Sequence, residues 1–186
     1  MEIKVIPDEQ TPCIPEMGDV SEFIKSNKQL LDSFLSFAES RSDAIGLAAN
    51  QISIDGERFM HRVFALCNLK DRSWRLIINP VIDEYIGIKE LKNEGCLTWV
   101  GRRIISERSR AVKVSYYDIN GNKTEGEFYK GFISQVWQHE LNHLNGIEER
   151  IERFGFKLPH QKDFERNKPC PCSSGKKYKQ CCLLLI

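Results

Sequence analysis

Residues 139–143 have the sequence His-Glu-Leu-Asn-His, and this segment constrains the fold more than any other part of the chain. Positions four apart lie on one face of an α-helix, so the imidazoles of His139 and His143 can reach a single metal ion. Glu140 projects near the same face and can hold a water next to that metal. Two neutral histidines and a carboxylate base are typical of metal-assisted hydrolysis. The alternative is a chance His-Glu pair on a solvated helix.

The pattern around this segment predicts a helix over residues 132–144 whose inward face is partly polar. Gly146 follows it closely, where a glycine favours termination of a helix. Apolar side chains at helical spacing predict a second helix over residues 21–40, beginning near Ser21 and ending before Arg41. We expect this second helix to be part of the scaffold.

The region between the two helices is predicted to form strands. Four segments have the apolar or alternating content of short strands: 62–66, 75–78, 111–117 and 124–129. Pro80 is expected to end the second of them. Asn120-Gly121 predicts a hairpin between the last two, since both positions of such a turn favour positive φ. The fold class is therefore α+β, with antiparallel strands around a central helix that carries the polar cluster.

A catalytic metal site normally needs a third protein ligand, and two further segments offer polar groups. Cys96 follows Gly95, which permits a close approach of the backbone. Taken alone, such a cysteine is more often a small core residue. The segment 44–51 contains several small residues and ends in Gln51, whose side-chain N–H can donate to an oxyanion. The alternative for that segment is a buried turn that enters a strand.

The three segments together resemble the peptide deformylase family over roughly residues 1–155. The family signatures are Gly-x-Gly-Leu-Ala-Ala-x-Gln, Glu-Gly-Cys-Leu and Gln-His-Glu-x-x-His. This chain has Ala-Ile-Gly-Leu-Ala-Ala-Asn-Gln from Ala44, Glu-Gly-Cys-Leu from Glu94, and Gln-His-Glu-Leu-Asn-His from Gln138, in the same order. The resemblance is what makes Cys96 a candidate metal ligand rather than a core thiol.

The resemblance implies a metal-dependent hydrolase that removes the formyl group from the N-terminal formylmethionine of nascent polypeptides and releases formate. It assigns one catalytic divalent metal, typically ferrous iron with zinc, nickel or cobalt as substitutes, to three residues: Cys96, His139 and His143. It assigns proton transfer to Glu140, and oxyanion binding to Gln51 and the backbone of Leu97. It assigns substrate contacts to three residues: Gly46, Ile45 and Glu94.

Three positions depart from the family pattern. Ala44 stands where the family usually has glycine, and a positive φ there would cost alanine roughly 1 kcal/mol. Asn142 replaces a usual aspartate and removes a charge near the site. Gln135, one helical turn before His139, stands where the family commonly has an apolar residue. These departures bear on rate and specificity more than on reaction type.

The C-terminal tail is a separate module. Four of the seven cysteines form two close pairs at its core: Cys170, Cys172, Cys181 and Cys182. Such pairs, joined by a glycine-containing loop, can form a closed site for one structural Zn²⁺, and the segment resembles the SEC-C motif. The alternative is a reactive, disordered tail. Lysines between the pairs suit an acidic partner, and we expect the ribosome as a candidate.

These boundaries divide the chain into three parts: a catalytic domain at 1–158, a linker at 159–168 and a zinc-binding motif at 169–186. The net charge of +1 gives no bulk field towards nucleic acid or membrane, and no membrane partner is expected. No apolar run approaches the ~20 residues that span a bilayer. Residues 1–8 lack the apolar core of a signal peptide, so we expect a cytoplasmic protein.

Two other functions remain open at this point. A zinc metalloprotease built on the two histidines and Glu140 would not need Cys96. A catalytically inactive deformylase-like protein could serve as a binding module that carries the tail. The complete set of candidate catalytic residues argues against the second, because an enzyme that loses its function usually loses one of them.

Overall fold

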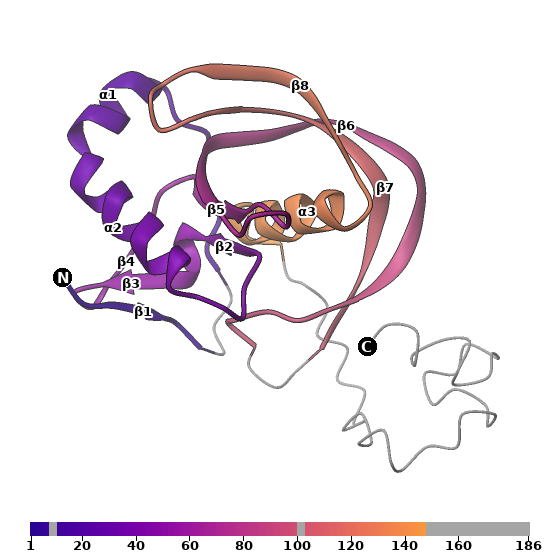
Figure 1. Ribbon diagram of the computed structural model, residues 1–186, viewed down its shortest axis with the longest axis horizontal. Coiled ribbons are helices and arrows are strands. Elements are labelled where there is room, and N and C mark those ends of the chain that lie inside the picture. The colour runs from indigo at the N-terminus through magenta and orange to yellow at the C-terminus, as the bar shows by residue number, and fades with distance from the viewer. Residues whose placement is uncertain (8–10, 100–102, 148–186) are drawn as a thin grey trace, which may run out of the picture.

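The computed structural model describes residues 1–7, 11–99 and 103–147 (Figure 1). A five-stranded antiparallel sheet has the order β2-β5-β6-β7-β8, and its strands are Gly46–Ala48, Val63–Cys67, Trp74–Glu94, Ile104–Tyr117 and Lys123–Lys130. A three-stranded sheet has the order β1-β3-β4, and its strands are Ile3–Val5, Ile52–Ile54 and Glu57–Arg58. The helices are α1 (Val20–Ser26), α2 (Lys28–Glu39), the 3₁₀ turn η1 (Ala49–Gln51) and α3 (Phe132–Leu144).

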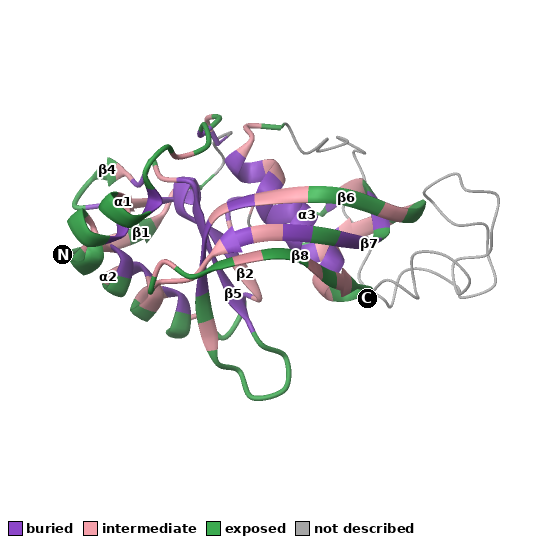
Figure 2. Cartoon of the chain, turned by 90° about the horizontal axis from the view of Figure 1, so that it is seen from above, coloured by how far each residue is buried: buried purple, intermediate pink, exposed green. Residues whose placement is uncertain are grey.

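Helix α3 lies in the centre of the molecule, and the long strands β6 and β7 curve around it (Figure 1). Its apolar side packs against the sheet through four buried residues: Val136, Trp137, Leu141 and Leu144. The Trp137 ring meets Phe64 edge-to-face at 4.9 Å and stacks with Tyr129 at 5.6 Å. Figure 2 shows buried residues along α3, whereas much of β8 is exposed. The helix predicted over residues 132–144 is confirmed with those bounds.

The prediction of one helix over residues 21–40 was wrong in one respect, because the structure has two helices there. Asn27 ends α1 and begins α2, and its side-chain amide donates to the Phe23 carbonyl at 2.9 Å. Asp19, rather than Ser21, caps the start of α1 by accepting from the backbone N–H of Glu22 at 2.9 Å. Both helices cover a second apolar cluster that includes Leu31 and Phe34. No helix among the described residues is long and apolar enough to cross a membrane.

Strand β6 does not end at Pro80, contrary to the sequence expectation. The strand continues to Glu94, and its pairing with β7 shifts register between Ile78 and Val81. Proline has no N–H to donate, and such an irregularity tolerates it within a strand. Asn79 takes a φ of +50° beside it, and its side-chain oxygen accepts from the Met17 N–H at 2.9 Å. The continuation of β6 past Pro80 carries the chain to the candidate site.

The predicted hairpin between residues 111–117 and 124–129 is confirmed as β7 and β8. Only one of its two expected turn residues has positive φ, namely Gly121 at +82°. The Asp118 carboxylate accepts from the backbone N–H groups of Asn120 and Asn122 at 2.8 and 2.9 Å. Side-chain hydrogen bonds of this kind stabilise the turn without two left-handed residues.

Candidate metal centre

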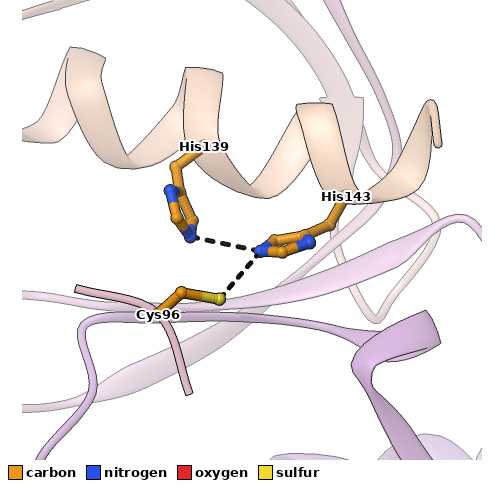
Figure 3. Close-up of side chains that lie close together, drawn as sticks. All are labelled: Cys96, His139 and His143. Atoms are coloured by element: carbon orange, nitrogen blue, oxygen red, sulfur yellow. Dashed lines mark hydrogen bonds between the residues drawn. The ribbon is translucent and has the colours of Figure 1, made fainter. Parts of the chain in front are cut away.

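Three side chains converge beside α3: Cys96, His139 and His143 (Figure 3). Their possible ligand atoms all lie within 4.8 Å of one another. His143 Nε2 is 3.2 Å from His139 Nε2 and 3.3 Å from Cys96 Sγ. The helix supplies both imidazoles on one face, and the segment after β6 brings the sulfur to them. A thiolate and two imidazoles form a donor set that suits zinc, iron, nickel or cobalt.

His139 is oriented by a buried ion pair behind it. Glu94 Oε2 lies 2.8 Å from His139 Nδ1, so the carboxylate accepts the proton there. Arg108 donates to both oxygens of Glu94, at 2.9 Å from Nε and 2.7 Å from Nη2. The side chains of Glu94 and Arg108 are at most 4% exposed. Both oxygens of Glu94 are thus engaged within the protein, where they support His139. The expected contact of Glu94 with substrate stays a prediction.

The pKa values of the two imidazoles are shifted in opposite directions. Burial alone would lower the pKa of His139, but hydrogen bonds with Cys96 and Glu94 and the charge of Glu140 raise it well above its ordinary value. Burial and the charges of His139 and Arg108 lower the pKa of His143 well below its ordinary value. Burial would raise the pKa of Glu94, but its hydrogen bonds with His139 and Arg108 lower it. An imidazole must be neutral to bind a metal. In the metal-free chain these shifts favour the neutral form of His143 and oppose it for His139.

Glu140 follows His139 in the sequence, and its side chain lies against Gly46 of strand β2. It is 4% exposed. A Cβ atom added to Gly46 would lie 2.4 Å from Glu140 Oε1 and 2.8 Å from the carboxyl carbon. Real Cβ atoms essentially never approach that closely. Any residue other than glycine at position 46 would therefore force the Glu140 side chain or the backbone of β2 to move.

The orientation of the Gln51 amide is fixed by the backbone. Its Oε1 accepts from the Ala48 N–H at 2.8 Å, so its Nε2 must face the site. Nε2 lies 3.1 Å from His143 Nε2, 3.4 Å from Cys96 Sγ and 3.0 Å from Thr98 Oγ1. The expected position of Gln51 at the site is thus observed, with a side-chain N–H directed to the point where the three ligand atoms meet.

The backbone near Gly46 lies at an edge of the five-stranded sheet. Strand β2 pairs with β5, and the Cys67 N–H donates to the Ile45 carbonyl at 2.8 Å. Polar groups alternate in direction along an antiparallel strand. Because the carbonyl of Ile45 points towards β5, the N–H and C=O of Gly46 point away from β5. Leu97, the remaining expected contributor, follows Cys96 directly, and its side chain packs against the cluster beneath α1 and α2.

Of the three departures from the family pattern, Ala44 can be examined most directly. Only three non-glycine residues of the described chain have positive φ: Asp55, Arg72 and Asn79. Ala44 is buried and is not among them, so the expected strain does not arise. Gln135 is half-buried on α3, one turn before His139, and Asn142 is also half-buried.

Sequence reasoning missed three residues that support the centre: Thr11, Asn50 and Arg108. Asn50 donates to the His143 carbonyl at 2.7 Å, and Thr11 contacts both the carbonyl and the ring of the same histidine. None of the three lies in a pattern of metal-ligand spacing. Thr11 is 132 positions from His143, so only the folded chain brings them together.

Comparison with known proteins agrees with this geometry. The sequence pattern of the polypeptide deformylase family matches residues 3–153, and that of the SEC-C motif matches residues 166–184, which lie outside the described part of the chain. A peptide deformylase of Thermotoga neapolitana is 36% identical over 105 residues. That match covers 56% of this chain and 59% of the relative, less than two thirds of its length.

Solved structures show the same fold. A peptide deformylase from Plasmodium falciparum has a TM-score of 0.58 and 29% identity, over 77% of this chain and 81% of that one. A deformylase from a Vibrio parahaemolyticus bacteriophage has a TM-score of 0.62 and 26% identity, over 77% of this chain and 98% of that one.

Proposed function

Because the chain belongs to the polypeptide deformylase family, we propose that it is a metal-dependent hydrolase acting on N-terminal formylmethionine of nascent polypeptides. The products are formate and a free methionyl N-terminus. The observation that carries this proposal is the convergence of one thiol and two imidazoles beside a buried carboxylate, Glu140. A cytoplasmic location, where new chains are made, belongs to the same proposal.

Cys96, His139 and His143 hold the catalytic metal in this proposal. Ferrous iron is the expected ion, and zinc, nickel and cobalt fit the same donors. When bound, the ion supplies Lewis acidity to the formyl carbonyl and lowers the pKa of a water. The hydrogen bond of His139 Nδ1 with Glu94 leaves His139 Nε2 directed to the site, which supports this assignment.

Glu140 acts as the general base and then as the general acid. Its carboxylate takes the proton of the attacking water and passes it to the amine that leaves. Gln51 Nε2 and the backbone N–H of Leu97 donate to the carbonyl oxygen as negative charge develops on it. The hydrogen bond from the Ala48 N–H holds the Gln51 amide in this orientation before any substrate binds.

The substrate backbone adds to the sheet beside Gly46. The outward-facing N–H and C=O of Gly46 offer the pairing that an extended peptide requires. Ile45, whose carbonyl is engaged by Cys67, contributes its half-buried side chain beside that strand. A peptide bound in this way would place its first residue close to Glu140, which lies directly over Gly46.

The tail contributes a separate function to the proposal. We assign residues 1–158 to catalysis, 159–168 to a linker and 169–186 to a SEC-C module. The four tail cysteines bind one structural Zn²⁺ in this proposal. A segment of fewer than ~20 residues cannot bury enough apolar surface to fold by itself, so metal binding must supply the folding energy. The basic tail would contact the ribosome, where formylated chains emerge. Metal analysis of the isolated tail and ribosome co-sedimentation of chains with and without it test both parts.

Formate release from a formyl-Met tripeptide, measured on iron-loaded protein without oxygen, tests the activity. Glu140→Ala should lower the rate by about 10²–10⁴-fold and keep its metal, since the carboxylate acts on the water. Glu107→Ala, a change at an exposed glutamate on β7, is the matched control and should leave the rate unchanged.

Three outcomes would contradict the proposal. Wild-type activity in Glu140→Ala would exclude Glu140 as the base. Cleavage of internal peptide bonds with Cys96→Ser still active would identify a zinc metalloprotease. A metal-loaded native protein that releases no formate would identify an inactive, deformylase-like binding module.

A further inference from the structure

The segment that begins at residue 11 runs along the C-terminal end of α3. The backbone N–H of Ile14 donates to the Leu144 carbonyl at 2.7 Å. The hydroxyl of Thr11, 4% exposed, donates to the His143 carbonyl at 2.9 Å. The same Oγ1 lies 3.4 Å from His143 Nδ1. This segment therefore contacts both the last turn of the helix and the ring of one candidate metal ligand.

The hydrogen-bond network determines which nitrogen of His143 carries the proton. The Ala48 N–H donates to Oε1 of Gln51, which fixes the orientation of the amide. The donor Nε2 of Gln51 therefore faces His143 Nε2, at 3.1 Å. An amide nitrogen has no lone pair to offer, so His143 Nε2 must be the acceptor. As a metal ligand, the imidazole is neutral and carries one ring proton. Its single proton is therefore on Nδ1, the atom that faces Thr11.

Thr11 has the chemistry to accept that proton. A hydroxyl donates one hydrogen and accepts through its lone pairs. The hydrogen of Thr11 is directed to the His143 carbonyl, which leaves the lone pairs for Nδ1–H. Asn50 Nδ2 donates to the same carbonyl at 2.7 Å and so helps to hold that end of the helix in place.

We propose that Thr11 is a positioning residue of the metal centre, whose hydroxyl accepts the Nδ1 proton of His143 and so keeps Nε2 turned towards the ion. The inference rests on the proposed metal site and adds a group behind its second imidazole. The two histidines are supported differently: an anionic carboxylate held by Arg108 stands behind His139, and a neutral hydroxyl stands behind His143. Such partners set the orientation and basicity of a ligand.

The test is Co²⁺ binding by the full chain, followed by its visible absorption bands. Thr11→Val removes the hydroxyl at nearly constant shape and should weaken Co²⁺ binding by about tenfold, the lower end for groups behind a ligand. Thr11→Ser restores the acceptor and should bind within about twofold of the native chain. A Cys96→Ser chain, titrated in parallel, supplies the signal of the tail cysteines for subtraction.

A second control separates orientation from general loosening. Ile14 packs in the same cluster as Leu141 and Leu144, so Ile14→Val loosens the same segment and keeps the hydroxyl of Thr11. It should leave Co²⁺ affinity within about twofold of the native value. The proposal is overturned if Thr11→Val binds as tightly as the native chain, if Thr11→Ser is as weak as Thr11→Val, or if Ile14→Val reproduces the loss. A native chain whose Cys96 site binds no Co²⁺ would overturn the proposed function as well.

Discussion

Gly46→Ala is the smallest change that should disable the catalytic carboxylate. The added methyl group would lie 2.4 Å from Glu140 Oε1 and 2.8 Å from two further atoms of that side chain. Ordinary van der Waals contact of a Cβ atom begins at 3.4 Å. Either Glu140 or the backbone of β2 must therefore move by about 1 Å.

A displacement of this size at a catalytic group costs about 10²-fold in rate. That factor corresponds to about 2.7 kcal/mol of transition-state stabilisation. The crowding should also lower the free energy of unfolding by about 1–3 kcal/mol, as overpacking usually does. Rate is more sensitive than stability here, because Glu140 can rotate away while the fold survives. The three atoms nearest to this methyl group all belong to Glu140, so we expect metal content to be retained.

The assay is formate release by the iron-loaded chain, with urea unfolding and metal analysis of the same samples. Gly18→Ala is the matched control, because a Cβ atom there meets nothing within 4 Å. In a Glu140→Ala background, Gly46→Ala should lower the rate of formate release little further, since the carboxylate that it displaces is already absent. Full activity in Gly46→Ala, or an equal loss in both backgrounds, would refute the argument that Gly46 makes room for Glu140.

Three further changes test other parts of the site and the tail. Cys96→Ser should strip or greatly weaken the catalytic metal, because a hydroxyl is not a thiolate at neutral pH; metal analysis showing full occupancy would contradict this. Glu94→Gln should lower the free energy of unfolding by about 3–5 kcal/mol, because it removes the carboxylate that pairs with the buried Arg108 guanidinium. Since the pKa of Glu94 is lowered in the folded state, the native chain should lose this stabilisation as the pH falls through that pKa, and Glu94→Gln should not. A chain truncated after Lys168 should keep its activity on short peptides and bind one zinc fewer; reduced activity would show that the tail acts in catalysis.

The local features of this chain follow from short-range patterns. The helix over residues 132–144 was predicted with its bounds because its apolar face repeats every turn, and the same repeat places His139 and His143 on one side. The β7–β8 hairpin follows from the turn residues between two alternating segments. In contrast, the break at Asn27 and the passage of β6 through Pro80 were missed. Each depends on one residue whose hydrogen bonds or register shift only the folded chain shows.

The sequence by itself determined the candidate donors, because three short segments in a fixed order indicate the family, and residue type fixes which atoms can bind a metal. The tertiary structure decided how those donors are supported. It made the Glu94 side chain a partner of His139, which the sequence did not predict, and it brought Thr11 to His143 across 132 positions. Neither contact has a local signature, because contacts of this kind arise from how β6, α3 and the N-terminal segment pack. Packing depends on the whole chain, whereas helical periodicity depends only on neighbouring residues.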